Sequence, residues 1–377
     1  MAHDTAPAVA PATVPPALGE PSVGRWEAEG DAARYVGILQ QRLVEGTARA
    51  GNVIEGIFSA IPEDQIAPAS RVQWRAEDGG FIVGVGDKQL RPTAYALGQI
   101  AERAGVPGPY LQSLVNAPAE EQWRRQLAAD ILSRHYGHTA GRMLVRSVRG
   151  QLRGWLSDKY RRLDSRPLVE ALVHEAGQLG AVPFDGSATD TRHALKVIIP
   201  QVIEPLPGEF MVLGAEWSNS DYGNGVNGIR AFALRVVCLN GMTRENLMKQ
   251  IHLGGRLSDD VELSAKTHAL DTRTSVSALR DVVRLALGPG RVERITEQLQ
   301  AAAARAMSAA VLRGRAEKMV PKAVVKSIVD AYESEDVINL PPGANAWRAS
   351  NAVSWIARHT EDEERRLDLE RLAGSLV

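Results

Sequence analysis

The sequence predicts an α+β fold: an antiparallel sheet with a basic β-hairpin, backed by helices and followed by a helical C-terminal part. Short apolar runs with a period of two residues fill the middle of the chain. From residue 271 onward the chain is rich in Ala and Leu and its apolar residues follow a helical period. Strands followed by helices are typical of an α+β protein.

Three regions are expected along the chain. Residues 1–24 are mostly Ala, Pro and other small residues without periodicity, which predicts a disordered tail. Residues 25–270 are expected to form the α+β core domain, and residues 271–377 a helical C-terminal region.

Start and stop signals predict the first elements. In "RPTAYALGQIAERAGVPGPY", Thr93 is placed to cap a helix that ends before Gly105. Further on, residues 143–148 and 151–157 are expected to form two short strands, joined by a tight turn at Arg149-Gly150. A helix is then expected from Ser165 to about Gly180.

Apolar runs predict the remaining strands. "ALKVIIPQVIEPLPGEFMVLGAEW" reads as two strands around a Pro-rich turn. "IRAFALRVVCL" is apolar on both faces, which is typical of a central strand that is covered on both sides.

Composition limits the function classes. The chain is 44% hydrophobic and 24% charged, as in ordinary globular proteins. Its single cysteine excludes a disulfide framework and a Cys-rich zinc site, and suits a reducing cytoplasm. No apolar run approaches the roughly 20 residues of a membrane helix. Because the formal net charge is −1, a nucleic-acid role has to depend on a local basic patch.

A glycine cluster, "SDYGNGVNG", raises the possibility of a nucleotide-binding loop. Gly223, Gly225 and Gly228 have G-x-G-x-x-G spacing, but that fingerprint requires a helix directly after the loop, and here a strand follows. We therefore predict that Gly225 and Gly228 occupy turn conformations at the mouth of a hairpin. Asp221 is expected to accept hydrogen bonds from local backbone amides.

Metal and cofactor sites are not predicted. His135 and His138 lack a third ligand at suitable spacing, and Cys238 lies in an apolar strand, where a thiol usually packs as a small hydrophobe.

The strongest charge signal lies between Arg142 and Arg166, where eight cations stand against two aspartates, a local net charge of +6. Arginines on a hairpin can contact phosphates, and Trp155 or Tyr160 could stack on a base. The alternative is that these arginines pair with acids elsewhere and lie over the sheet.

Three ordered stretches of the chain are "LVRSVRGQLRGWLSDKYRRLDSRPLVEAL", "WSNSDYGNGVNGIRAFALRVVCLNGM" and "ANAWRASNAVSWIARH". Together they resemble a family of phage- and plasmid-encoded proteins known as a domain of unknown function. That family commonly has an Asn-Ser-His-Asp-Gly type of sequence, whereas this chain has Asn-Ser-Asp-Tyr-Gly at 219–223, so the usual His is replaced. The layout is also similar to single-strand annealing proteins of phage recombination and of the Rad fifty-two type.

The resemblance implies a non-enzymatic protein of phage or mobile-element origin in the cytoplasm of a bacterial host cell. It would bind single-stranded DNA during recombination, and anneal it, as a ring or filament and without a cofactor. The expected DNA contacts are Arg142, Arg146, Arg149, Arg153, Lys159, Arg161, Arg162, Arg230 and Arg235, the last two on a strand neighbouring the hairpin. Two alternatives remain open. One is a hydrolase-type enzyme with a polar site at Asn219, Asp221 and Asn240, and the other is a protein that binds a host factor through its helical C-terminal part.

Overall fold

The computed structural model describes residues 31–77, 80–236, 240–250, 263–288, 290–337 and 340–377. The predicted tail at 1–24 and Cys238 lie outside these residues. The fold class is confirmed: the chain is α+β, with two mostly antiparallel sheets and a helical C-terminal region. The predicted boundary at 270/271 falls within a helix, α6 (Ala265–Leu287).

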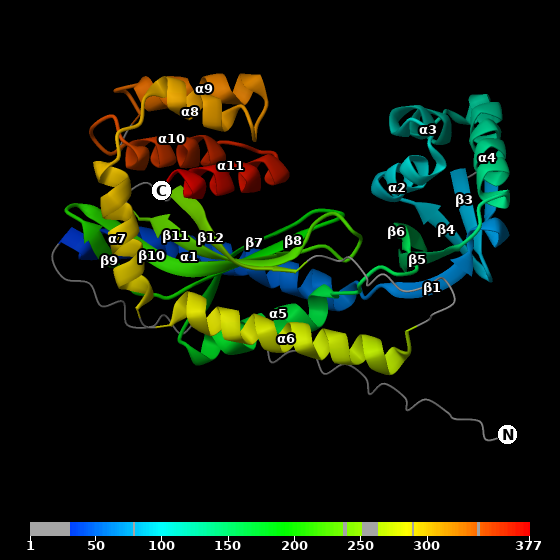
Figure 1. Ribbon diagram of the computed structural model, residues 1–377, viewed down its shortest axis with the longest axis horizontal. Helices are drawn as coiled ribbons and strands as arrows, with labels where there is room; N and C mark the ends of the chain where they lie inside the picture. The colour runs from blue at the N-terminus through cyan, green and yellow to red at the C-terminus, as the bar shows by residue number, and fades with distance from the viewer. Residues whose placement is uncertain (1–30, 78–79, 237–239, 251–262, 289, 338–339) are drawn as a thin grey trace.

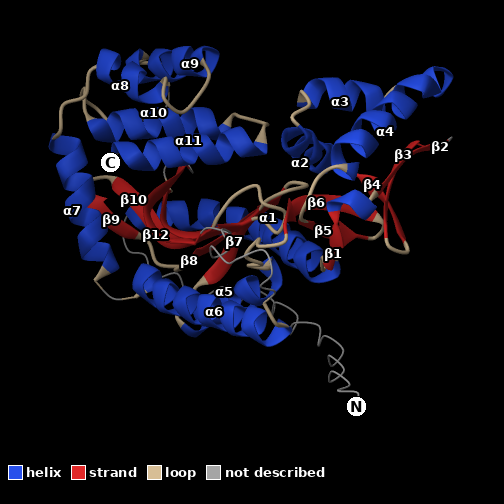
Figure 2. Cartoon of the chain, turned by 45° about the vertical axis from the view of Figure 1, so that its right-hand side comes forward, coloured by secondary structure: helices blue, strands red, loops and turns tan. Residues whose placement is uncertain are grey.

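The smaller lobe holds one six-stranded sheet with the strand order β1-β5-β6-β4-β3-β2 (Figures 1 and 2). Its pairs are antiparallel except for β4 and β6, which run parallel. Three helices, α2 to α4, lie together on one side of this sheet (Figure 2). The elements are β1 (Glu63–Pro68), β2 (Gln73–Glu77), β3 (Gly80–Val85), β4 (Lys88–Pro92), α2 (Ala94–Ala104), α3 (Gly108–Val115), α4 (Gln122–Gly137), β5 (Arg142–Val148) and β6 (Gln151–Ser157).

The larger lobe holds the second sheet, with the order β12-β11-β10-β8-β7 and with β9 also paired to β10. Helices α5 and α6 cover one face of this sheet, whereas α10 and α11 lie on the other, with α8 and α9 as an outer layer (Figure 1). The strands are β7 (Val182–Ala188), β8 (His193–Ile198), β9 (Ile203–Leu206), β10 (Glu209–Asn219), β11 (Asn227–Arg235) and β12 (Asn240–Gln250). The other helices are α1 (Asp31–Ser59), α5 (Ser165–Gln178), α7 (Arg291–Ala304), α8 (Ala309–Ala316), α9 (Lys322–Glu333), α10 (Ala346–Arg358) and α11 (Glu363–Leu376).

Each lobe has its own core. The smaller lobe's core surrounds Trp74, Tyr136 and Trp155, where the Trp155 indole donates to the Tyr136 hydroxyl at 3.1 Å. The main cores of the larger lobe draw on α1 and on residues from 163 onward. In chain order the smaller lobe therefore lies as an insertion between α1 and α5.

Several local predictions are confirmed. The β5–β6 hairpin turns at Arg149 and Gly150, whose φ angles of 49° and 77° are those of a tight hairpin turn. The Thr93 hydroxyl caps α2 by accepting from the amide of Ala96, and Gly105 ends that helix in the left-handed region. Helix α5 also begins at Ser165 as predicted.

The β11 strand is central and covered on both faces, as predicted. Phe232 and Leu234 pack in the same cluster as Leu39 of α1, whereas Ile229 on the opposite face packs in the same cluster as Leu279 of α6. However, β11 does not neighbour the hairpin. Its partners are β10 and β12, whereas β5 and β6 pair with β1 and β4 in the other sheet.

The glycine loop joins β10 to β11 and agrees only in part with the prediction. Gly223 and Gly225 have positive φ angles of 90° and 152° in the turn. Gly228 was wrongly predicted as a turn residue: it lies inside β11 opposite Ser218. Asp221 does accept a hydrogen bond from a backbone amide, but the donor is Ser165, 56 residues away.

Candidate anion-binding site

The arginine side chains of the β5–β6 hairpin each contact a different part of the protein. The side chain of Arg142 pairs with Asp158 at 3.4 Å. Arg149 is exposed in the turn and donates to the backbone oxygen of Ser59 at 3.3 Å. The guanidinium of half-buried Arg153 lies 5.7 Å from the ring centre of Tyr222.

Arg146 is buried between the lobes rather than exposed on the hairpin. Only 1% of its side chain is accessible, and its guanidinium bonds to Asp64 at 2.7 Å and Asp164 at 2.6 Å. It also donates to the backbone oxygen of Asp221 at 2.7 Å. Burial alone would lower the pKa of Arg146, but Asp164, Asp64 and Asp221 hold it above its usual value. The burial of Arg146 does not favour the predicted DNA contact, because carboxylates and backbone surround its guanidinium, and that contact stays a prediction.

The cations that follow the hairpin are mostly paired. Arg161 forms a two-pronged pair with Asp271, with N–O distances of 2.7 and 2.6 Å. Arg162 lies 3.3 Å from Asp64, and Lys159 is half-buried.

The two arginines of β11 lie in the other sheet and contact its acidic residues. Arg230 donates to Ser218 at 3.0 Å and lies 3.4 Å from Glu216. Arg235 is 4% exposed and forms a two-pronged pair with Glu209. Its burial in this pair does not favour the predicted DNA contact, which stays a prediction.

These positions favour the alternative that the arginines of the hairpin pair with acids. They form no continuous exposed track, so single-strand binding and annealing along the hairpin stays a prediction without support from their geometry.

The polar site considered for an enzyme is assembled only in part. Asn219 and Asp221 lie together in the buried boundary between the lobes, where the Asn219 amide donates to the backbone oxygen of Leu163 at 2.6 Å. The Oδ1 of Asp221 accepts from the amide and the hydroxyl of Ser165, both at 2.8 Å. Asn240 begins β12 opposite Arg235, at the other end of β11, so it does not join them. The three residues therefore form no common site.

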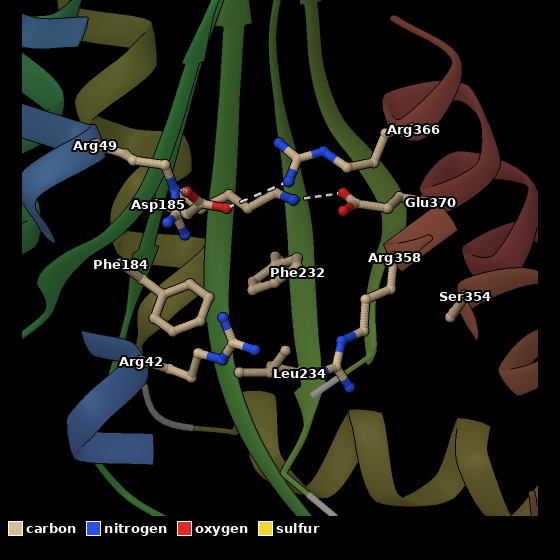
Figure 3. Close-up of a pocket in the computed structure, with 11 residues that line it drawn as sticks. Arg42, Arg49, Phe184, Asp185, Phe232, Leu234, Ser354, Arg358, Arg366 and Glu370 are labelled. Carbon is tan, nitrogen blue, oxygen red and sulfur yellow. Dashed lines mark hydrogen bonds and ion pairs between the residues drawn. The ribbon is translucent and has the colours of Figure 1, made fainter. Parts of the chain in front are cut away.

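A pocket of about 420 Å³ lies where α1, the strands of the larger sheet and the α10–α11 pair meet (Figure 3). Five of its lining residues are cationic and two are acidic, which leaves a net charge of +3. The cations are Arg42, Arg49, Lys196, Arg358 and Arg366, and the acids are Asp185 and Glu370.

One end of the pocket is a network of ion pairs around the buried side chains of Asp185, Lys196 and Glu370. The Lys196 amino group lies 2.5 Å from Glu370, and Asp185 bonds to Arg49 at 2.7 Å and lies 3.8 Å from Arg366. Burial alone would lower the pKa of Lys196, but nearby carboxylates, Glu370 foremost, hold it above its usual value. Burial raises the pKa of Glu370, although Lys196 opposes that shift. This network of ion pairs forms one charged wall of the pocket.

The other end is more open and is flanked by two arginines. Arg42 from α1 and Arg358 from α10 extend from opposite walls over a floor that includes Phe184, Phe232 and Leu234 (Figure 3). Arg358 is exposed, and the side chain of Arg42, paired with Glu45 at 3.1 Å, is 41% accessible. The pocket therefore offers accessible guanidinium groups next to an apolar surface, an arrangement that suits an anionic ligand with a non-polar part.

Sequence reasoning missed this pocket. The only local signal was Lys196, a charge within the otherwise apolar run "ALKVII". The four arginines come from α1, α10 and α11, whose separation in the chain hides their convergence.

Comparison with protein-family models, with curated proteins and with solved structures found no match to this chain. The resemblance to the phage and plasmid family therefore stays a prediction based on the motifs quoted above. Among the described residues, no helix is both long and apolar enough to cross a membrane. The same residues contain no group of three or more His, Cys, Asp or Glu side chains placed to hold a metal ion.

Proposed function

We propose that the protein binds a small phosphorylated ligand in the pocket between α1, the larger sheet and the α10–α11 pair. The observation that carries this proposal is the excess of cations in a concave site of about 420 Å³, within the size range of small-molecule sites. A phosphate monoester carries close to two negative charges near neutral pH, which complements the net charge of the lining.

Arg42 and Arg358 are the residues we assign to the phosphate. Arg358 is exposed and the side chain of Arg42 is 41% accessible, and a guanidinium group can donate two parallel hydrogen bonds to phosphate oxygens. Phe184, Phe232 and Leu234 would contact the organic part of the ligand. Arg49 and Arg366 share Asp185, so their contribution to binding is smaller.

Calorimetric titration tests the proposal with inorganic phosphate, sugar phosphates and nucleoside monophosphates, alongside the unphosphorylated compounds. We expect a phosphate monoester to bind and its unphosphorylated form not to bind. The double variant Arg42→Gln/Arg358→Gln should weaken binding at least tenfold, because each lost charge-assisted hydrogen bond contributes about 1.5–3 kcal/mol.

A charge-matched control is the double variant Arg134→Gln/Arg280→Gln, which removes two exposed arginines outside the pocket. It should bind as the unaltered protein does. Equal affinity in the pocket variant and in the unaltered protein, with both folded, would show that the pocket is not the binding site.

A further inference from the structure

A second cationic surface lies on the outer helical layer of the larger lobe, at the junction of α8 and α9 (Figure 1). Between residues 313 and 326 the chain carries five cations and a single acid, Glu317, a local net charge of +4. We name this set the α8–α9 patch: Arg313, Arg315, Lys318, Lys322 and Lys326.

The five cations of the patch are available, unlike those of the hairpin. All five are exposed, and none makes an ion pair or side-chain hydrogen bond with any other described residue. Most of the neighbouring apolar residues are in the core, namely Leu312 of α8 and Val325, Ile328 and Val329 of α9, whereas Val311 and Met319 are exposed. Packing therefore orients the two helices so that their charged residues face solvent.

We infer that the α8–α9 patch binds double-stranded DNA through its phosphates, without reading the base sequence. Lys322 and Lys326 are one turn apart on α9, about 6 Å along the helix axis. Duplex DNA presents one negative charge for about every 1.7 Å of its axis, so a patch of this size can face several phosphates. Such contact costs these cations little, because no ion pair with another described residue has to break first.

Side-chain chemistry favours a duplex over a single strand at this surface. Proteins that hold single strands usually stack bases on aromatic side chains. The only aromatic residue between α8 and the end of α9 is Tyr332, which is 5% exposed and donates its hydroxyl to the backbone oxygen of Met307. The patch thus provides phosphate contacts without a stacking platform.

The test is the binding of a fluorescent 20-base-pair duplex to the full chain over a series of salt concentrations, repeated with a duplex of unrelated sequence. We expect equal affinity for both duplexes, and a logarithmic salt slope of about −0.9 for each phosphate neutralised. Lys322→Gln/Lys326→Gln should make the slope shallower by about two units and weaken binding at low salt by at least tenfold.

Two controls keep the inference separate from the proposed function. Arg134→Gln/Arg280→Gln removes the same exposed charge elsewhere and should leave the slope unchanged, and Arg42→Gln/Arg358→Gln should bind duplex normally. An absence of duplex binding at low salt, or an unchanged slope in the folded Lys322/Lys326 variant, would overturn the inference. Binding of poly-glutamate to the patch without binding of duplex would also overturn the inference, because that outcome identifies an acidic protein as the partner.

Discussion

At the residue scale, the most consequential side chain is Arg146, because it joins segments from both lobes. Asp64 precedes the smaller lobe's hairpin in the chain, Asp164 follows it, and Asp221 comes from the loop between β10 and β11. The arginine is neutralised by carboxylates whose own positions depend on it. Removing the cation from such a group is costly, because it leaves the buried carboxyl of Asp221 and the partly exposed carboxylates of Asp64 and Asp164 without it.

We expect Arg146→Met to lower the free energy of unfolding by about 3–5 kcal/mol, because it leaves a set of carboxylates without their cation. Arg149→Ala, in the exposed turn of the same hairpin, should change it by less than about 0.5 kcal/mol. Urea unfolding of the two variants measures the difference. Similar stabilities would mean that Arg146 does not hold the lobes together.

The carboxyl group of Asp221 should make the free energy of unfolding depend on pH. Burial raises the pKa of its carboxyl to about 6, with Asp164 adding to the shift and Arg146 opposing it. The pKa of an Asp carboxyl in the unfolded chain is about 3.9, so the folded state binds the proton more tightly. The stability that this proton contributes is present below about pH 4 and is lost as the pH rises through about 6.

Asp221→Asn tests this effect, because the amide oxygen can still accept from Ser165 but cannot titrate. The unfolding free energy of the unaltered protein minus that of the variant should fall by about 2–3 kcal/mol between pH 4 and pH 6. Denaturant titrations at half-unit intervals of pH supply the measurement. A difference that stays constant or increases over that range would contradict the shift.

The sequence predicted the position of Arg146 on a strand but not its environment. Residues 143–148 form a short, mostly apolar run before the turn signal at Arg149-Gly150, so the strand followed from local pattern alone. The burial of Arg146 depends on carboxylates from three separate parts of the chain, and no local pattern contains that information. The local +6 charge was therefore real, while its availability to DNA could not be predicted.

At the element scale, α1 shows how closely a helix can lie against a strand. Gly46 has no side chain, and a Cβ atom built there would lie 1.7 Å from the backbone oxygen of Phe184 in β7. The backbone of β7 is also close to α1 at Gly186, where a Cβ atom would lie 2.8 Å from the Cα of Ala50. Two glycines thus allow the backbones of α1 and β7 to approach each other.

Two substitutions on α1 should have opposite effects. Gly46→Ala forces the helix away from β7 and should destabilise the protein by about 1–3 kcal/mol or more. Gly56→Ala meets nothing within 4 Å and should stabilise it by about 0.5–1 kcal/mol, since alanine favours a helix. Thermal unfolding followed by circular dichroism distinguishes the two, and a shift of the same sign in both would disprove the close approach.

At the scale of the whole molecule, the two sheets and their separate cores are what sequence reasoning could not supply. Individual strands were predicted, but the pairing of β5 with β1 and β6 with β4 joins segments separated by tens of residues. The residue pattern of one strand does not show which other strand it pairs with. The pocket was missed for a related reason, since it exists only where α1 meets α10 and α11 across a sheet.

The separate cores predict that the smaller lobe folds by itself. Its main cluster contains only residues from Ala67 to Trp155, so a fragment of residues 61–158 retains it entirely. We expect cooperative thermal unfolding of this fragment, with a near-ultraviolet signal from the contact of Trp74 with Tyr136. A gradual transition without that signal would show that the lobe requires its neighbour.

The insertion of the smaller lobe also sets an order of events during synthesis. The Thr47 hydroxyl of α1 bonds to the backbone oxygen of Pro183, 136 residues further along the chain. At a translation rate of roughly 5–20 residues per second, α1 emerges about 7–27 seconds before that partner exists. The smaller lobe is complete within this interval and can already be folded while the apolar stripe of α1 is still uncovered. The nascent chain therefore carries a folded smaller lobe while α1 still lacks its packing partners. We expect chaperones on the ribosome to bind the exposed apolar side chains of α1 during this interval.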